Sequence, residues 1–316
     1  MEENNFSVLN DEIDIHAFIS YLFTKKRLIL GVSLLVGGLA FSSTFFLNKK
    51  YTSVAVLAPS DKFQSSSLEK LASRFGGLAS LAGISLPIGR TQKDVIAIEM
   101  LTSWSFVDSF IKRNKLTVEL MAGDSWDQKT GKLKINPKRY DVKNQKWESG
   151  WLRSILSDEK PREPSSWKQY KAFVKHLKVD RNDKTGLTTI SFSSVSPVLA
   201  QTWLDLLIKN VNEEYKQKDI ENIKTNIAYL KKQVRETNLS EMKSIFYQLI
   251  EEQTKAYMVA QSTNDYVFSV VSSPMTPDVN QASYPKRKVF LICGIFLGMM
   301  GSVIFLLFRW KGTGVE

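Results

Sequence analysis

Two long apolar runs, one near each end of the 316-residue chain, constrain this protein more than any other feature. They are Leu28–Leu47 and Val289–Phe308, each 20 residues long and without a charged side chain. At about 1.5 Å of rise per residue, a helix of this length crosses a bilayer core roughly 30 Å thick. Basic side chains bracket both runs, a pattern typical of membrane spans rather than of buried core helices. We therefore predict transmembrane helices at residues 28–47 and 289–308.

The first run predicts an anchor rather than a cleaved leader. A leader has an apolar stretch of about 7 to 15 residues followed by small residues, whereas this run is longer and ends in bulky side chains. Apolar residues spaced along the preceding segment favour a short amphipathic helix on the membrane surface. Two spans place both termini on one side of the membrane and residues 48–288 on the other.

The orientation follows from basic residues in the short segments. The flanking charges balance, but the positive-inside rule ignores a loop as long as this one, so Lys25–Arg27, Arg309 and Lys311 indicate cytoplasmic ends. The only cysteine, Cys293, lies inside the second predicted span, which suits a large domain in an oxidising compartment. We predict a cytoplasmic segment (1–27), a periplasmic domain (48–288) and a cytoplasmic tail (309–316) in a bacterial inner membrane.

The ends of the periplasmic domain predict strands beside the two spans. Residues 51–58 and 266–271 are rich in β-branched and aromatic side chains and stop before prolines, so we expect them to share a membrane-proximal sheet. Residues 177–180 and 187–193 predict two further strands joined by a turn. Helices are expected at 68–75, before a small-residue loop at 76–83, and at 94–115 with a break at Ser103; 124–167 is expected to be irregular.

The strongest helical signal begins at Ser196, a good N-cap, with Pro197 at the first helical position. Helical spacing continues to about Arg235, so the helix would reach roughly 60 Å. Its heptad-like packing stripe consists of Ile220, Ile223, Ile227, Leu230 and Val234. A capping pattern at Asn238 and Glu241 begins a second helix that returns the chain to the sheet.

The predicted fold class is therefore α+β. A membrane-proximal mixed α/β base (48–195 and 264–288) carries a long helical hairpin extension (196–263), and two transmembrane helices flank both. The alternative is a helical pair folded down as ordinary core.

No catalytic or cofactor site is visible in the sequence. There is no phosphate-binding Gly-rich loop of the P-loop type. The two histidines, His16 and His176, fall on opposite sides of the membrane, and neither has nearby cysteines to complete a zinc site. We therefore predict no enzyme activity, no metal and no cofactor. The net charge of +11 comes in good part from the span flanks and indicates membrane headgroups rather than nucleic acid.

Two further patterns have both a functional and a structural interpretation. Residues 126–170 interleave lysines with aromatic residues; they suit a surface for an acidic polymer, or simply aromatics turned inward and lysines outward. Gly294, Gly298 and Gly301 place small residues near one face of the second span, where they would let helices approach closely.

The layout resembles the Wzz, or chain length determinant, family of polysaccharide co-polymerases over nearly the whole chain. The supporting residues are the acidic segment 11–15, the Tyr51–Ser53 entry after the first span, and residues 183–188 running into 196–200. Most specific is the exit, where Pro274, Pro277 and Pro285 resemble the family's proline-rich membrane junction. Prolines fix φ and exclude helix, so they would form a stiff strut. Residues 280–283 depart from the family, since a further proline is more usual there.

The resemblance implies a homo-oligomeric ring of protomers in the inner membrane. It further implies a non-enzymatic role in setting the modal chain length of lipopolysaccharide O-antigen, with a Wzy-type polymerase and lipid-linked polysaccharide as partners. Two alternatives stay open: a capsule or exopolysaccharide co-polymerase with a separate tyrosine kinase, and a two-span periplasmic sensor, for which the tail at 309–316 offers little room for an output module.

Overall fold

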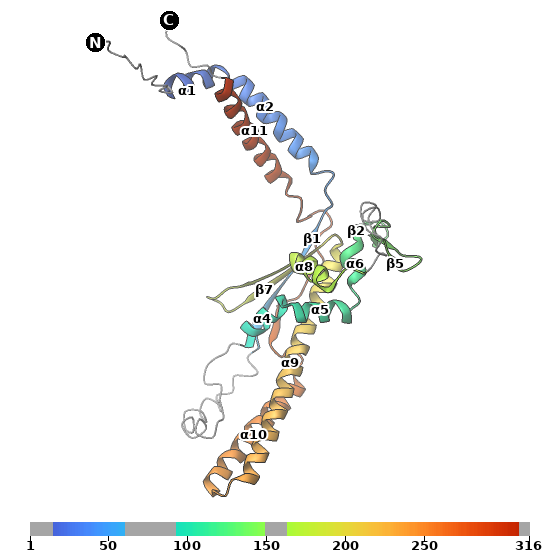
Figure 1. Cartoon of the computed structure of the whole chain (residues 1–316), viewed down its shortest axis with the longest axis vertical. Helices are drawn as coiled ribbons and strands as arrows, with labels where there is room; N and C mark the ends of the chain where they lie inside the picture. Colours follow the sequence, from blue (N-terminus) through green and yellow to red (C-terminus); the bar gives the residue numbers. More distant parts are fainter. Residues whose placement is uncertain (1–14, 61–92, 149–162, 310–316) are drawn as a thin grey trace, which may run out of the picture. The chain divides into compact units, whose positions relative to one another are not determined.

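A computed structural model describes residues 15–60, 93–148 and 163–309 (Figure 1). The chain divides into two compact units, Met1–Lys49 with Ser283–Glu316, and Lys50–Ala282. The predicted helix at 68–75 and the loop at 76–83 lie outside the described residues, as does the acidic segment at 11–14.

The unit of the two chain ends is helical. Its elements are α1 (Ile15–Thr24), α2 (Lys26–Ser43) and α11 (Arg287–Arg309). Helices α2 and α11 pack side by side, and both are long and apolar enough to cross a membrane by length and composition. This finding agrees with the two predicted spans.

Helix α2 ends four residues earlier than the predicted span of 28–47. The hydroxyls of Ser43 and Thr44 donate to the carbonyl oxygens of Ala40 and Phe41, each at 2.7 Å. Hydroxyl side chains that bond to nearby backbone offer the chain an alternative to continued helix. Hydropathy alone does not register this competition, so the predicted boundary was wrong at this end.

The larger unit is built on a four-stranded antiparallel sheet with the order β6-β7-β1-β8. The strands are β1 (Tyr51–Pro59), β6 (Leu177–Arg181), β7 (Thr188–Ser194) and β8 (Phe268–Ser272). All four predicted strands are confirmed, and the strand after the first span shares the sheet with the strand before the second.

One face of this sheet is buried beneath helices. Along β1, buried residues alternate with more exposed ones, and Ala55 and Leu57 are fully buried. Phe192 of β7 packs against Phe173 and Trp203, with ring centroids 5.1 and 5.5 Å apart. Alternation of this kind is what a sheet with one covered face requires.

Short helices complete the base. They are α4 (Lys93–Thr102), α5 (Trp104–Arg113), α6 (Thr117–Ala122) and α8 (Ser166–His176). Ser103 separates the first two, and its hydroxyl accepts a hydrogen bond from the Phe106 amide as an N-cap. The predicted break at Ser103 is confirmed.

The segment expected to be irregular contains regular structure. Within 124–167 lie most of a hairpin of β2 (Gly123–Trp126) and β3 (Leu133–Ile135), a second hairpin of β4 (Tyr140–Asp141) and β5 (Lys146–Trp147), and the start of α8. Asp127 and Asp141 form tight turns by accepting the amides of Lys129 and Lys143. Strands of two to four residues are too short to show an alternating pattern, which is why the sequence prediction missed them.

The helical hairpin extends from the base (Figure 1). Helix α9 (Pro197–Glu236) runs for 40 residues, and α10 (Ser240–Ser262) packs back against it. The Ser196 hydroxyl caps α9 by accepting from the Leu199 amide, as predicted. The cap predicted at Asn238 is wrong: Leu239 occupies that position without a side-chain bond, because the connection between the helices is only three residues long.

Candidate functional site

The first half of α9 is the foundation of the hairpin. Its buried apolar side chains face the covered side of the sheet and belong to the main hydrophobic core: Trp203, Leu204, Leu207, Ile208 and Val211. Because the same continuous helix then forms the first arm of the hairpin, the contacts at this foundation fix the direction in which the hairpin leaves the base.

Asn212 joins the foundation to β8. Its side-chain oxygen accepts the amides of Val267 and Phe268, both at 2.9 Å, and its Nδ2 donates to the Phe268 carbonyl at 3.0 Å. The sheet partner of Phe268 is Pro59, which has no N–H to donate. Asn212 is only 4% exposed, so its amide satisfies backbone groups that water cannot reach.

One turn further along α9, Asp219 joins the helix to two other elements. Lys93 of α4 donates to its carboxylate at 2.6 Å, and the Tyr266 hydroxyl, just before β8, donates to the same oxygen. Burial, together with the Asp219 carboxylate, raises the pKa of Tyr266 above its ordinary value. Burial and the charges of Asp219 and Asp94 raise the pKa of Tyr215 to about 12. Both phenols therefore remain protonated at neutral pH.

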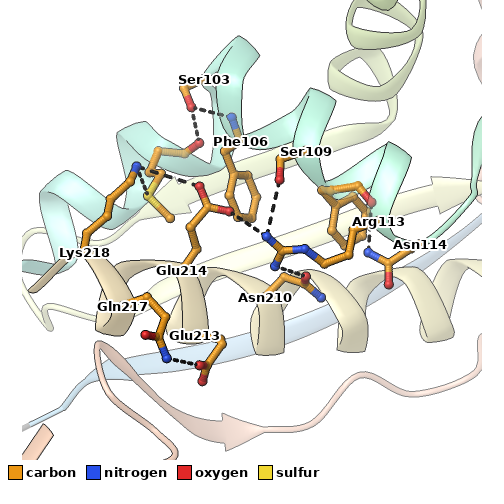
Figure 2. A network of polar contacts seen from close by, with 12 residues as sticks. Ser103, Phe106, Ser109, Arg113, Asn114, Asn210, Glu213, Glu214, Gln217 and Lys218 are labelled. Atoms are coloured by element: carbon orange, nitrogen blue, oxygen red, sulfur yellow. Dashed lines mark hydrogen bonds and ion pairs between the residues drawn. The ribbon is translucent and has the colours of Figure 1, made fainter. Parts of the chain in front are cut away.

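A second polar row joins α5 to α9 (Figure 2). Arg113 of α5 donates to Asn210 at 3.2 Å and lies 3.8 Å from the Glu214 carboxylate, which in turn lies 3.8 Å from Lys218. The arginine and lysine side chains are more than half exposed, and such ion pairs contribute about 0 to 1 kcal/mol each. The row therefore orients α5 on α9 more than it stabilises the fold.

The predicted stripe follows α9 from the core into the hairpin. Ile220 belongs to the main core, Ile223 is buried, and Leu230 forms a second apolar cluster with Phe246 and Leu249 of α10. The two other members are half-buried: Val234 packs on the second cluster, and Ile227 lines a shallow surface pocket with Lys224, Ala228, Lys231 and Tyr257.

Two of the three predicted glycines lie where α11 meets α2. A Cβ added to Gly294 would lie 2.6 Å from the Ala40 Cβ, and one added to Gly298 would lie 2.8 Å from the Ser33 Cα. Gly301 has open space instead, and the buried face continues at Ser302. On α2 the matching small residue is Gly37, which the sequence analysis did not single out.

The prolines of the predicted junction fall in different units. Pro274 is buried in the larger unit, and its carbonyl accepts a hydrogen bond from the Gln201 side chain at 3.2 Å. Pro277 is half-buried nearby, in a segment without helix or strand. The Ser53 hydroxyl donates to the Met275 carbonyl at 2.8 Å, so this segment is attached to β1. Pro285 precedes α11 in the unit of the chain ends.

The aromatic residues of 126–170 mostly pack on one another. Tyr140 and Trp147 meet edge to face with ring centroids 5.0 Å apart, and the Trp126 ring lies 6.0 Å from that of Tyr51. Trp167 differs, since it is 54% exposed and stacks on Tyr170. The structure therefore favours the inward-aromatic interpretation for the hairpins and leaves one ring open to solvent.

Among the described residues, no group of three or more histidine, cysteine, aspartate or glutamate side chains could hold a metal ion. His176 lies at the last position of α8, and its ring donates to the Ser193 carbonyl. Burial, and then the charges of Lys50 and Lys175, lower the pKa of His176 to about 4.

These features define a class of protein with a membrane-compatible helix toward each end and a mixed α/β base that carries a helical hairpin. Residues 11–113 match the model of the Wzz family, described as chain length determinant protein, so this third of the chain is of the Wzz type. The match confirms the resemblance drawn from the sequence.

Solved structures give a further comparison. The chain is 15% identical to a full-length bacterial polysaccharide co-polymerase, with 95% of this chain and 97% of that one covered and a TM-score of 0.37. It is 17% identical to a fragment of WzzB, a polysaccharide co-polymerase from Salmonella Typhimurium, over 75% of this chain and all of that fragment, with a TM-score of 0.32. No curated protein sequence matches the chain.

Proposed function

We propose that this protein is a polysaccharide co-polymerase that regulates the modal chain length of lipopolysaccharide O-antigen. The single observation that carries the proposal is the match of residues 11–113 to the chain length determinant family. The protein catalyses no step itself; it acts on a Wzy-type polymerase and on lipid-linked polysaccharide through its shape and assembly.

The proposal places the chain in the bacterial inner membrane, with α2 and α11 as spans and the larger unit in the periplasm. The two apolar helices support this topology by length and composition, and the basic residues beside them support cytoplasmic ends. Attaching a reporter enzyme within the Asp183–Gly186 turn tests it, because reporter activity specific to the cytoplasm would contradict the proposal.

Protomers are proposed to associate side by side into a ring through the base and the spans. The open glycine at position 301 offers α11 a second close-approach surface, beyond the one used against α2. In this proposal the stripe from Ile220 to Val234 keeps the two arms of the hairpin together, and the segment from Pro274 to Pro285 sets how the base joins the second span. A solely monomeric particle in detergent or nanodiscs would count against the ring.

Deletion of the gene, followed by gel separation of surface polysaccharide, tests the function. Without the protein, O-antigen should still be made but should lose its clustered length distribution. Re-expression of the wild-type chain should restore the cluster. An unchanged ladder in the deletion strain would overturn the proposal, and a change confined to capsule or exopolysaccharide would assign the protein to that glycan instead.

A further inference from the structure

One end of the four-stranded sheet gathers basic side chains. Lys50 directly precedes β1, whose first residue, Tyr51, pairs with Ser194 at the end of β7. Lys175 and His176 are the last two residues of α8 and directly precede β6, whose first residue pairs with Phe192. The sheet register therefore brings Lys50, Lys175 and His176 to the same end.

The surrounding elements provide almost no negative charge. Neither α8, β1 nor β7 contains an aspartate or glutamate. The one acidic residue of β6, Asp180, pairs with Thr189, away from this end of the sheet. Helix α6 packs on α8 and carries Glu119, but that carboxylate accepts a hydrogen bond from Trp203. Among the residues that the structure describes, no ion pair involves Lys50 or Lys175.

The three basic groups are close enough to repel one another. Burial and then the charge of Lys175 lower the pKa of Lys50, and both lysines contribute to the lowered pKa of His176. The C-terminal end of α8 does favour cations, but a helix end supplies only about half of one negative charge, which falls short of two lysines. The protein therefore holds repelling cations together without an internal counter-ion.

We propose that Lys50 and Lys175 bind the phosphate group of a membrane-associated anion, with His176 beside it. Two ammonium groups provide charge-assisted hydrogen bonds of the kind that phosphate accepts. Lys50 lies seven residues beyond the last residue of α2, a candidate span, so the chain connects the site closely to the membrane segment. Bound phosphate also favours protonation of His176, which then donates a third hydrogen bond.

The phosphate has two possible sources with the same chemistry. One is a phospholipid headgroup, which would hold the base against the bilayer surface. The other is the phosphate that joins a lipid-linked glycan to its carrier, which would place the substrate of the proposed function at the sheet end. The binding site itself goes beyond the proposed function and does not depend on it.

The test uses the full chain in nanodiscs of neutral phosphatidylcholine, with inorganic pyrophosphate as the probe and titration calorimetry as the readout. We expect Lys50→Gln and Lys175→Gln each to weaken pyrophosphate binding about tenfold, because each removes one charge-assisted bond. The matched control is Lys138→Gln, which removes an equal charge from an exposed lysine elsewhere. Equal affinities for all four proteins would overturn the proposal.

A second measurement reports on the site without relying on folding of the lysine variants. The chain has only two histidines, so isotope labelling of histidine with the His16→Gln variant isolates the His176 signal. Saturating pyrophosphate should raise the pKa of His176 measured by NMR. An unchanged His176 pKa would refute the site.

Nanodiscs that contain phosphatidylglycerol then identify the source. If the headgroup is the ligand, the pKa of His176 rises without added pyrophosphate, and pyrophosphate binds more weakly to the wild type. If only soluble pyrophosphate moves the pKa, the glycan-linked phosphate is assigned. Failure of both pyrophosphate experiments would leave the chain-length assay untouched, so the two proposals fail independently.

Discussion

Replacing Asn212 with leucine should destabilise the base severely, although the two side chains are similar in size. The change removes three hydrogen bonds to the backbone of Val267 and Phe268 and leaves two N–H groups and one carbonyl without their partner. Each buried polar group without a partner costs about 1 to 3 kcal/mol. Partial relaxation and the gained apolar contact offset part of this, so we expect a loss of about 3 to 5 kcal/mol, a large share of the stability of a typical domain.

Hydrogen exchange with mass spectrometry on the detergent-solubilised full chain measures this effect. Asn212→Leu should accelerate exchange in the peptide that contains Val267 and Phe268 far more than elsewhere. Asn210→Leu is the matched control, because Asn210 is on the same helix but is half-exposed, and its side chain bonds to Arg113 and the Leu206 carbonyl. That control should lose less than about 1 kcal/mol. Equal exchange in the two variants would refute the reasoning.

The remaining predictions concern the helix contact and two titrating groups. Gly294→Leu should lower the thermal unfolding temperature of the detergent-solubilised protein through a clash costing about 1 to 3 kcal/mol, whereas Gly301→Leu, in open space, should not. Stability should fall as pH rises from about 10 toward 12, because the unfolded chain ionises Tyr215 while the folded chain keeps its proton; Asp219→Asn should weaken this pH dependence in alkaline unfolding curves. Stability should also fall as pH drops from about 6.5 toward 4, because the unfolded chain protonates His176 first, and His176→Gln should flatten that part of the curve.

Features coded by neighbouring residues were predictable from the sequence. The Ser196 cap with Pro197 fixed the start of the long helix, and Ser103 marked a break, because a cap acts within a single turn. The strands beside the spans were found from their composition, and their common sheet followed from the chain connectivity.

Features that join distant parts of the chain were not predictable. Asn212 bonds to residues 55 and 56 positions away, and the need for it arises only once Pro59 lies opposite Phe268. The basic end of the sheet likewise depends on a register that brings Lys50 near Lys175. On the second span, glycine content was visible, but the exact rotation that selects Ser302 over Gly301 for the contact with α2 is set by the partner helix.

The continuity of α9 makes the hairpin a lever. A single helix of 40 residues begins inside the core and ends at the far turn, with no proline or glycine after its first residue to absorb bending. Over its length of about 60 Å, each degree of tilt at the first turn displaces the last turn by about 1 Å. Small repacking beside the sheet would thus be magnified into a wider or narrower spacing between neighbouring hairpin tips.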